Sequence, residues 1–423
     1  MQIMRKMKDS GIEWIGEIPE GWEVTKLKYL STFPIEKNAH TDSPYIGLEN
    51  IESWTGKYVS SDSQYDKSQA LAFFENNILF GKLRPYLAKV FCASNDGCCS
   101  SEFCILNFSS SVNIRYFWNL LISPTFIDHV TKSTYGTKMP RANTDFIKNI
   151  CVPVPPRIEQ DRIALYLDAT SAKIDSLISE TRSSIEEYKK LKQAVITQAV
   201  TKGVRGEREM KDSGVEWIGE IPKEWSTPKI KRLHNGLTDG THGTFNRIDS
   251  GHILLSSKNV REFGIQLGEN ESFISEADYN LITANGFPQK DDVLLCCIGA
   301  SIGRCTLYEF EEAMAFQRSV IFIRCNSLIL PRMMMYDLRS SNTLLQEQLL
   351  VNQSAQAGLY QGLVSEIFIS LPPISEQKEI IAYLDAKCAE IDRLITKKEQ
   401  LVKELESYKK SLIYEVVTGK REV

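Results

Sequence analysis

The sequence has no long apolar run, since none of its 423 residues lies in a stretch that approaches the ~18 apolar residues of a membrane-spanning helix. The N-terminus MQIMRKMKDSG also lacks the apolar stretch of a signal peptide. Hydrophobic residues make up 42% and charged residues 25%, as in ordinary soluble globular proteins. We therefore expect a folded cytoplasmic protein, and about 150 residues per domain predicts two or three domains.

Catalytic motifs are also missing. There is no GxxxxGK loop followed by Ser or Thr for nucleotide phosphates, and no GxGxxG after a strand. The Asn/Asp-Pro-Pro-aromatic motif, with which amino-methyltransferases hold a target base, is absent because the two Pro-Pro pairs precede Arg157 and Ile374. The acidic pair Asp291 and Asp292 lacks the nearby Glu/Asp-x-Lys of a nuclease metal site. The sequence therefore predicts a protein that is not an enzyme.

Metal-ligand spacing is absent as well. The ten cysteines are irregularly placed without CxxC pairs, and the five histidines have no ligand spacing between them. We expect the thiols to be reduced and mostly buried, and the chain to hold no metal or other cofactor. The Gly-spaced run at residues 299–303 predicts a turn or a close backbone approach rather than a cofactor cradle.

What the sequence does contain is an internal repeat. Residues 7–19 (MKDSGIEWIGEIP) and 210–222 (MKDSGVEWIGEIP) differ at one position. Residues 155–178 (PPRIEQDRIALYLDATSAKIDSLI) and 372–395 (PPISEQKEIIAYLDAKCAEIDRLI) form a second matching pair. Duplication explains both pairs. The blocks between the matching segments, about 31–154 and 234–371, show no comparable identity.

This order of segments predicts an α+β fold. We expect two globular domains in a pseudo-twofold arrangement, at residues 1–154 and 207–371, each beginning with an EWIGEIP segment. They alternate with two long spacer helices at residues 155–206 and 372–423. Duplicated segments that hold two divergent domains are suited to a protein that recognises two different ligands or sequences.

The two predicted helices each carry an apolar stripe at heptad a/d spacing. In the first helix the stripe is Ile163, Leu167, Ile174, Leu177, Tyr188, Leu191 and Val195, and in the second it is Ile380, Leu384, Ile391, Leu394, Leu401, Leu405, Tyr408 and Leu412. A helix over residues 163–200 would extend roughly 57 Å. We expect the two helices to pair antiparallel as a rigid spacer. The alternative is that they dimerise with another copy of the chain.

The chain closely resembles the specificity subunit of type I restriction-modification systems. The resemblance covers nearly the whole chain and rests on the two EWIGEIP segments, FGKLRPYLAKVF at residues 80–91, SSEF at 100–103, DGTH at 239–242 and the two Pro-Pro helix starts. It implies two target-recognition domains that bind double-stranded DNA, separated by conserved helices. It further implies assembly with modification (methyltransferase) subunits, two of them, and with restriction/translocase subunits. S-adenosylmethionine, ATP and Mg are then expected on those partners.

Polar and basic side chains in loops are the candidates for DNA contact, because phosphates and base edges are bound by such groups. In the first block they are Lys82, Arg84, Tyr86, Lys89, Lys138, Arg141 and Asn143. In the second block they are Thr241, His242, Thr244, Arg247, Lys258, Asn259, Arg304, Gln317, Arg318 and Gln353. For each cluster the alternative is an ordinary solvated loop.

The charge balance bears on how DNA would be held. The formal net charge is −4, and residues 234–371 contain 9 Lys/Arg against 15 Asp/Glu, which gives 9 − 15 = −6. An isolated protein of this charge would bind DNA weakly at physiological salt. We therefore expect DNA binding to depend on basic partner subunits.

The leading hypothesis is recognition of a bipartite DNA target, with half-sites about one helical turn, roughly 34 Å, apart. A protein-binding scaffold without DNA specificity is the alternative. A stand-alone nuclease is the third class, and the missing acidic-lysine cluster argues against it.

Overall fold

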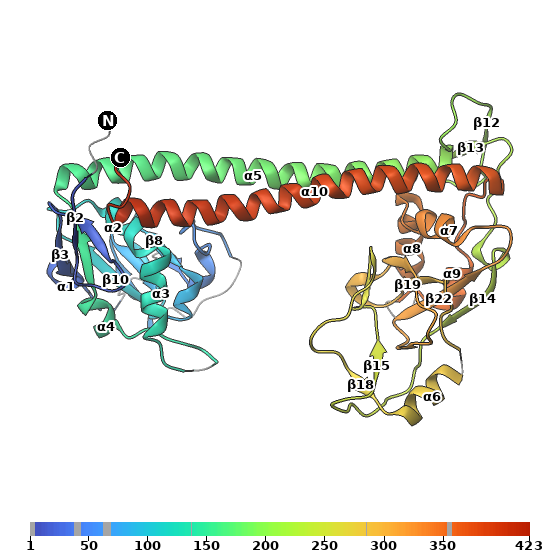
Figure 1. Ribbon diagram of the computed structural model, residues 1–423, viewed down its shortest axis with the longest axis horizontal. Helices are drawn as coiled ribbons and strands as arrows, with labels where there is room; N and C mark the ends of the chain where they lie inside the picture. The colour runs from blue at the N-terminus through green and yellow to red at the C-terminus, as the bar shows by residue number, and fades with distance from the viewer. Residues whose placement is uncertain (1–4, 38–43, 62–68, 137, 285, 353–357) are drawn as a thin grey trace. The chain divides into compact units, whose positions relative to one another are not determined.

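The computed structural model describes residues 5–37, 44–61, 69–136, 138–284, 286–352 and 358–423. The chain forms two compact units (Figure 1). Unit 1 combines Met1–Arg182 with Glu399–Val423, and unit 2 is Ser183–Lys398. The two long helices are α5 (Arg157–Lys202) and α10 (Ile374–Val417), so each unit contains one globular region and a stretch of both helices. The predicted α+β class with two globular regions and two long helices is confirmed.

The core of unit 1 is a four-stranded antiparallel sheet in the order β4-β10-β7-β8. Its central strand β10 is the apolar run FCILNF, which is buried at five of its six positions. A second sheet has the order β5-β9-β6. The strands of these sheets are β4 (Ser31–Thr32), β5 (Tyr45–Ile46), β6 (Leu71–Phe73), β7 (Ile78–Gly81), β8 (Val90–Cys92), β9 (Gly97–Cys99) and β10 (Phe103–Phe108).

The remaining strands of unit 1 form two pairs, β1 with β2 and β3 with β11. Their bounds are β1 (Met7–Asp9), β2 (Glu17–Pro19), β3 (Glu23–Lys26) and β11 (Cys151–Val154). The helices are α1 (Leu27–Leu30), α2 (Ile114–Leu121), α3 (Pro124–Lys132) and α4 (Thr144–Asn149), with 3-10 helices η1 (Leu48–Asn50) and η3 (Pro85–Leu87). The Asn113 side chain accepts a hydrogen bond from the Tyr116 amide and so caps α2.

Unit 2 repeats the main sheet of unit 1, with the order β14-β22-β19-β20. A second sheet, β18-β15-β21, again contains one parallel pair. The strands are β12 (Met210–Asp212), β13 (Glu220–Pro222), β14 (His234–Asp239), β15 (His252–Leu255), β16 (Val260–Arg261), β17 (Gly264–Ile265), β18 (Phe273–Ile274), β19 (Val293–Cys296), β20 (Cys305–Leu307), β21 (Ala315–Phe316) and β22 (Val320–Cys325). The globular regions therefore share a fold although their sequences show little identity.

Shorter helices complete the described part of unit 2. They are α6 (Glu276–Ala284), α7 (Pro331–Leu338), α8 (Ser341–Asn352), α9 (Gln361–Ser365) and the 3-10 helices η4 (Ile230–Arg232) and η5 (Gly299–Ser301). Pro331 occupies the first turn of α7, where a proline costs no helical hydrogen bond. The same reasoning applies to the Pro-Pro pairs, because α5 and α10 begin immediately after them.

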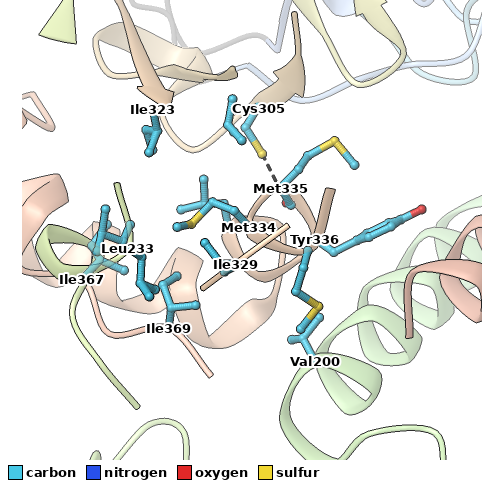
Figure 2. Close-up of a cluster of buried hydrophobic side chains, with 14 of the residues drawn as sticks. Val200, Leu233, Cys305, Ile323, Ile329, Met334, Met335, Tyr336, Ile367 and Ile369 are labelled. Atoms are coloured by element: carbon cyan, nitrogen blue, oxygen red, sulfur yellow. Dashed lines mark hydrogen bonds between the residues drawn. The ribbon is translucent and has the colours of Figure 1, made fainter. Parts of the chain in front are cut away.

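Each unit is completed by the helix end that comes from the other half of the sequence. In unit 1, the last turns of α10 are buried, and the Tyr116 hydroxyl lies within hydrogen-bonding distance of the backbone oxygens of Pro153, at 3.1 Å, and Val417, at 3.0 Å. In unit 2, Val200 of α5 joins the hydrophobic cluster that also contains Leu233 and Ile369 (Figure 2). The structural units therefore do not coincide with the two repeats of the sequence.

The two helices run antiparallel within each unit. In unit 1, Lys409 pairs with Asp175 at 2.7 Å and Arg182 pairs with Glu406 at 2.6 Å, so residue numbers rise along one helix as they fall along the other. In unit 2, the Lys192 ammonium lies 2.7 Å from Asp392. Lys409 and Asp175 occupy the repeat positions of Lys192 and Asp392, so the duplication has produced the same ion pair twice.

The buried stripe of the helices follows an eleven-residue repeat, not the predicted heptad. Ile163, Ile174, Ile185 and Ile196 are buried in α5, and Ile380, Ile391, Val402 and Ile413 are buried in α10. Four side chains of the predicted heptad stripe are instead exposed: Leu177 (50%), Leu191 (49%), Leu401 (44%) and Tyr408 (47%). On a helix of 3.6 residues per turn, a strict heptad drifts by about 20° every seven residues, whereas a spacing of eleven residues makes slightly more than three full turns and drifts by about 20° only every eleven residues.

The other predicted stripe positions keep to the buried side. Ile163, Leu167, Ile174, Ile380, Leu384, Ile391 and Leu412 are buried, and Tyr188, Val195, Leu394 and Leu405 are half-buried.

Candidate nucleic-acid interface

The turn between β7 and β8 carries the first group of candidate residues in unit 1. The 3-10 helix η3 forms its centre, and Arg84 and Ala88 on either side of it have left-handed backbone angles, with φ of 51° and 47°. Arg84 and Tyr86 are exposed, and Lys82 is half-buried. The turn therefore presents an arginine and an aromatic ring to solvent.

A second segment of the first block lies against this turn. The Arg84 amide donates to the Pro140 oxygen at 2.7 Å, and the Ala142 amide donates to the Lys82 oxygen at 2.9 Å. Lys138, Arg141 and Asn143 are exposed beside the turn. The structure thus brings together two clusters that are more than fifty residues apart in the sequence.

Other side chains of this surface are occupied or were missed. Arg141 pairs with Glu102 at 2.5 Å, and Asn143 caps α4 by accepting a hydrogen bond from the Asp145 amide at 2.7 Å. Tyr135 is 62% exposed on the same segment and was not among the predicted residues. An exposed tyrosine in a Ser/Thr/Gly-rich loop is a signal that could have identified it.

Lys89 does not belong to the exposed surface. Its ammonium donates to the Leu48 oxygen at 2.7 Å inside unit 1, and burial lowers the pKa of Lys89. We therefore remove Lys89 from the candidate contacts, because a backbone carbonyl holds its charge within the domain.

In unit 2, the end of β14 lies beside the turn between β21 and β22. The Thr241 amide donates to the Phe316 oxygen at 2.7 Å, and the Arg318 amide donates to the Thr241 oxygen at 3.0 Å. Gly240 allows this approach, since a Cβ there would collide with the Phe316 and Gln317 oxygens. Thr241, Gln317 and Arg318 therefore form one cluster although they lie far apart in the sequence.

Two further segments reach this cluster. The Gln317 amide donates to the Leu255 oxygen at the end of β15, and the Ser257 amide donates to the Ser319 hydroxyl at 3.0 Å. The exposed His242 contacts Asp239 at 2.7 Å, and Asp239 also accepts a hydrogen bond from Gln361. The loop ends at one side of the sheet are thus joined by hydrogen bonds.

The candidates that follow these segments differ in exposure. Thr244, Arg247 and Lys258 are exposed, and Lys258 forms an ion pair with Glu271 at 3.0 Å. Arg304 is half-buried, and its guanidinium donates to the Val260 oxygen at 3.2 Å. Gln353 lies outside the described residues.

Asn259 is not available for contact with DNA. It is 1% exposed, its carbonyl accepts from the Ser256 amide, and its amide nitrogen donates to Gln266 and Glu271. Asn259 is removed from the candidate contacts because it is buried with its polar groups bonded, and Arg304 because it is half-buried and its guanidinium is bound to a backbone carbonyl.

Comparison with known proteins identifies the family. The family model described as the type I restriction modification DNA specificity domain matches residues 19–187 and 254–404, which is more than half of the chain. The chain belongs to this family. Members are specificity subunits, so the chain recognises a DNA target and is not itself an enzyme.

Relatives of the specificity family align over nearly the whole chain. The type I restriction enzyme MjaVIII specificity subunit of Methanocaldococcus jannaschii is 27% identical, with 95% of this chain and 93% of the relative covered. A solved structure from work on complex assembly and conformational transition of the type I R-M system has a TM-score of 0.74 and 18% identity, with 96% and 99% coverage. The HsdS subunit of Thermoanaerobacter tengcongensis has a TM-score of 0.52 and 18% identity, with 96% and 98% coverage.

Among the residues that the structure describes, His, Cys, Asp and Glu side chains form no group of three or more that could hold a metal ion. Within the same ranges, no helix is both long and apolar enough to cross a membrane. Within the described residues, none of the ten cysteines forms a disulfide, and most of them are buried.

Proposed function

We propose that this specificity subunit recognises a bipartite DNA target, with one half-site read by each globular region. The observation that carries the proposal is that both units have the same sheet order, while the polar side chains on the loops beside the sheet differ. A repeated frame suits two similar modes of docking on DNA. Different side chains on that frame suit two different base sequences.

The proposed contacts are the exposed or half-buried polar and aromatic side chains of the two loop clusters. In unit 1 they are Lys82, Arg84, Tyr86, Tyr135, Lys138, Arg141 and Asn143, and in unit 2 they are Thr241, His242, Thr244, Arg247, Lys258, Gln317 and Arg318. Arginine and lysine suit phosphates and guanine edges, and asparagine and glutamine suit adenine edges.

The partners proposed for the complex are two methyltransferase subunits and the restriction/translocase subunits, in the cytoplasm. S-adenosylmethionine, ATP and Mg would then be bound by those subunits. The acidic balance of residues 234–371 supports this arrangement, because an isolated chain of that charge would be repelled by DNA phosphates.

Mapping of methylated motifs in cells tests the assignment of half-sites. We expect Arg84→Ala to change or relax one half-site and Arg318→Ala to change or relax the other, since a good bidentate base contact contributes about 1–3 kcal/mol of discrimination. Lys189→Ala is the matched control, because Lys189 is exposed on α5 and pairs with Glu186. A motif set that does not depend on the gene, or a single variant that alters both half-sites, contradicts the proposal.

We propose further that α5 and α10 set the unspecified gap between the half-sites. Inserting eleven residues after both Thr181 and Lys398 keeps the buried stripe in phase and adds roughly 16 Å to each helix. The expected result is a longer gap with unchanged half-sites. Altered half-sites with a constant gap would refute the role of the helices.

A further inference from the structure

Two nearly identical hairpins begin the globular regions. The β1–β2 hairpin covers residues 7–19 and the β12–β13 hairpin covers residues 210–222. Their strands pair in the same register, from Met7 with Pro19 in one to Met210 with Pro222 in the other. They differ only at the position of Ile12 and Val215.

Folding explains part of this identity. Ile15 and Ile18, with their counterparts Ile218 and Ile221, are buried. The Asp9 carboxylate accepts a hydrogen bond from the Gly11 amide at 2.9 Å, and Asp212 accepts one from Gly214 at the same distance. The glycines of both turns have positive φ, where other side chains are strained.

Three exposed charged positions of each hairpin are identical without such a reason. They are Lys8, Glu13 and Glu17 in the first hairpin and Lys211, Glu216 and Glu220 in the second. Within the described parts of the chain, none of these six side chains forms a hydrogen bond or an ion pair. Neither packing nor internal bonding therefore accounts for their identity.

The starts of the two long helices provide an internal control. At three pairs of exposed positions the charge has been reversed since the duplication: Asp161 and Lys378, Arg162 and Glu379, and Lys173 and Glu390. Buried positions of the same segments have stayed identical, as at Gln160 and Gln377. The two repeats have therefore diverged far enough to reverse exposed charges, including charges that form ion pairs, as at Asp161, Glu379 and Glu390. The hairpin charges have not diverged.

We propose that the two hairpins are equivalent docking surfaces for two copies of one protein with a basic contact surface. Lys8 against Asp9, Glu13 and Glu17 gives each hairpin a charge of 1 − 3 = −2. This charge repels DNA phosphates and complements basic protein side chains. Two identical surfaces bind two identical partners. The inference rests on the proposed function, on which the partner is the methyltransferase subunit.

The test measures how many partner copies the full-length chain binds. The variants are Glu13→Lys with Glu17→Lys, Glu216→Lys with Glu220→Lys, and all four together, each mixed with purified methyltransferase subunit and weighed by native mass spectrometry. We expect two copies on the unchanged chain, one on each double variant and none on the fourfold variant. Affinity at an altered hairpin should fall at least about tenfold, because like charges meet across the contact.

The matched control is Arg162→Glu, which places on α5 the residue that α10 already carries at the equivalent position. It should still bind two copies. Unchanged circular dichroism melting of all variants shows that lost binding is not lost folding. The inference is overturned if the fourfold variant still binds two copies, if it loses DNA binding but keeps its partners, or if only self-association of the chain changes.

Mapping of methylated motifs with the unchanged complex separates this inference from the proposed function. A bipartite motif together with unaffected partner binding by the hairpin variants leaves the proposed function intact and removes the docking surface. The number of methyltransferase subunits bound to the hairpin variants tests the docking surface independently of the methylated motif.

Discussion

The turn after β7 in unit 1 and the turn after β19 in unit 2 follow the same path with different residues. The Gly81 amide donates to the Lys89 oxygen at 2.9 Å, and the Cys296 amide donates to the Arg304 oxygen at 2.8 Å. In unit 1 the left-handed positions are Arg84 and Ala88, whereas in unit 2 they are glycines 299 and 303. The backbone path therefore depends on the sheet and its hydrogen bonds, and the side chains are free to differ.

The difference extends to what lies beneath each turn. In unit 1, α3 packs against η3, and its Val130 is fully buried. In unit 2, the equivalent position on α8 is Glu347, which is 1% exposed and lies against Gly303. Burial raises the pKa of Glu347 to about 8. An apolar support in one unit thus corresponds to a buried acid and a glycine in the other.

The largest difference between the units is expected from exchanging the residues at these turns. Gly303→Ala should destabilise unit 2 by about 3–4 kcal/mol, because φ is +84° and the new Cβ would lie 2.8 Å from Leu344 Cδ2 and closer still to the Glu347 carboxyl. Ala88→Gly should change the stability of unit 1 by less than about 1 kcal/mol, since relief of strain offsets lost burial. Calorimetric unfolding of the full chain measures both. Equal effects would contradict the comparison.

A pH effect should appear in unit 2. The pKa of Glu347 is raised, so the folded state holds its proton more tightly than the unfolded state does, and stability is lost as pH rises through about 8. Asp337 has its pKa raised to about 7 by burial, so its effect falls at lower pH. Between pH 7 and 9 we expect a loss of about 2 kcal/mol in denaturant titrations, most of it below pH 8. Glu347→Gln should flatten the curve in this window, and an unchanged slope would show that Glu347 is not responsible.

The eleven-residue repeat of the helices gives a third contrast. Ile185→Ala should cost about 2–3 kcal/mol because Ile185 is buried, whereas Leu177→Ala should cost less than about 0.5 kcal/mol. Thermal melting of the two variants measures the difference. If Leu177→Ala destabilised the protein more than Ile185→Ala, the heptad and not the eleven-residue repeat would describe the buried side of the helices.

The twin ion pairs of the helices give the smallest effect. Lys192 contacts both Asp392 and Glu262, whereas the ammonium of Lys409 is bonded to Asp175. We expect Lys192→Met to cost about 2 kcal/mol and Lys409→Met about 1 kcal/mol, since more carboxylates lose their partner in unit 2. In unit 1, the exchange of Lys409→Asp with Asp175→Lys should recover most of the loss, which a double-mutant cycle detects. If the exchange did not recover stability, the ion pair would not contribute to the alignment of α5 with α10.

Much of the fold could be predicted because repeats and Pro-Pro helix starts are local signals. The spacing of the buried residues along the two long helices was harder to predict, because leucines such as Leu177 match a heptad by chance over a few turns. Ile174, Ile185 and Ile196 were equally visible in the sequence, and their spacing of eleven identifies the buried side.

The candidate interface was predicted in fragments. Residue types located the loops around Arg84, Arg141 and Arg318, but the pairing of those loops depends on strand register, which brings together segments far apart in the chain. Lys89 and Asn259 have suitable residue types, yet backbone carbonyls of their own domains bind them, Leu48 in one case and Gln266 in the other. Composition alone contains no signal of that binding.

The sequence by itself determined the duplication, the two long helices and the family, because these are encoded in the order and identity of neighbouring residues. Only the tertiary structure decided that each unit is completed by a helix end from the other repeat, as with Val417 in unit 1 and Val200 in unit 2. It also decided which polar side chains remain free for a partner. Both depend on burial and hydrogen bonding between residues hundreds of positions apart, and local patterns do not specify such contacts.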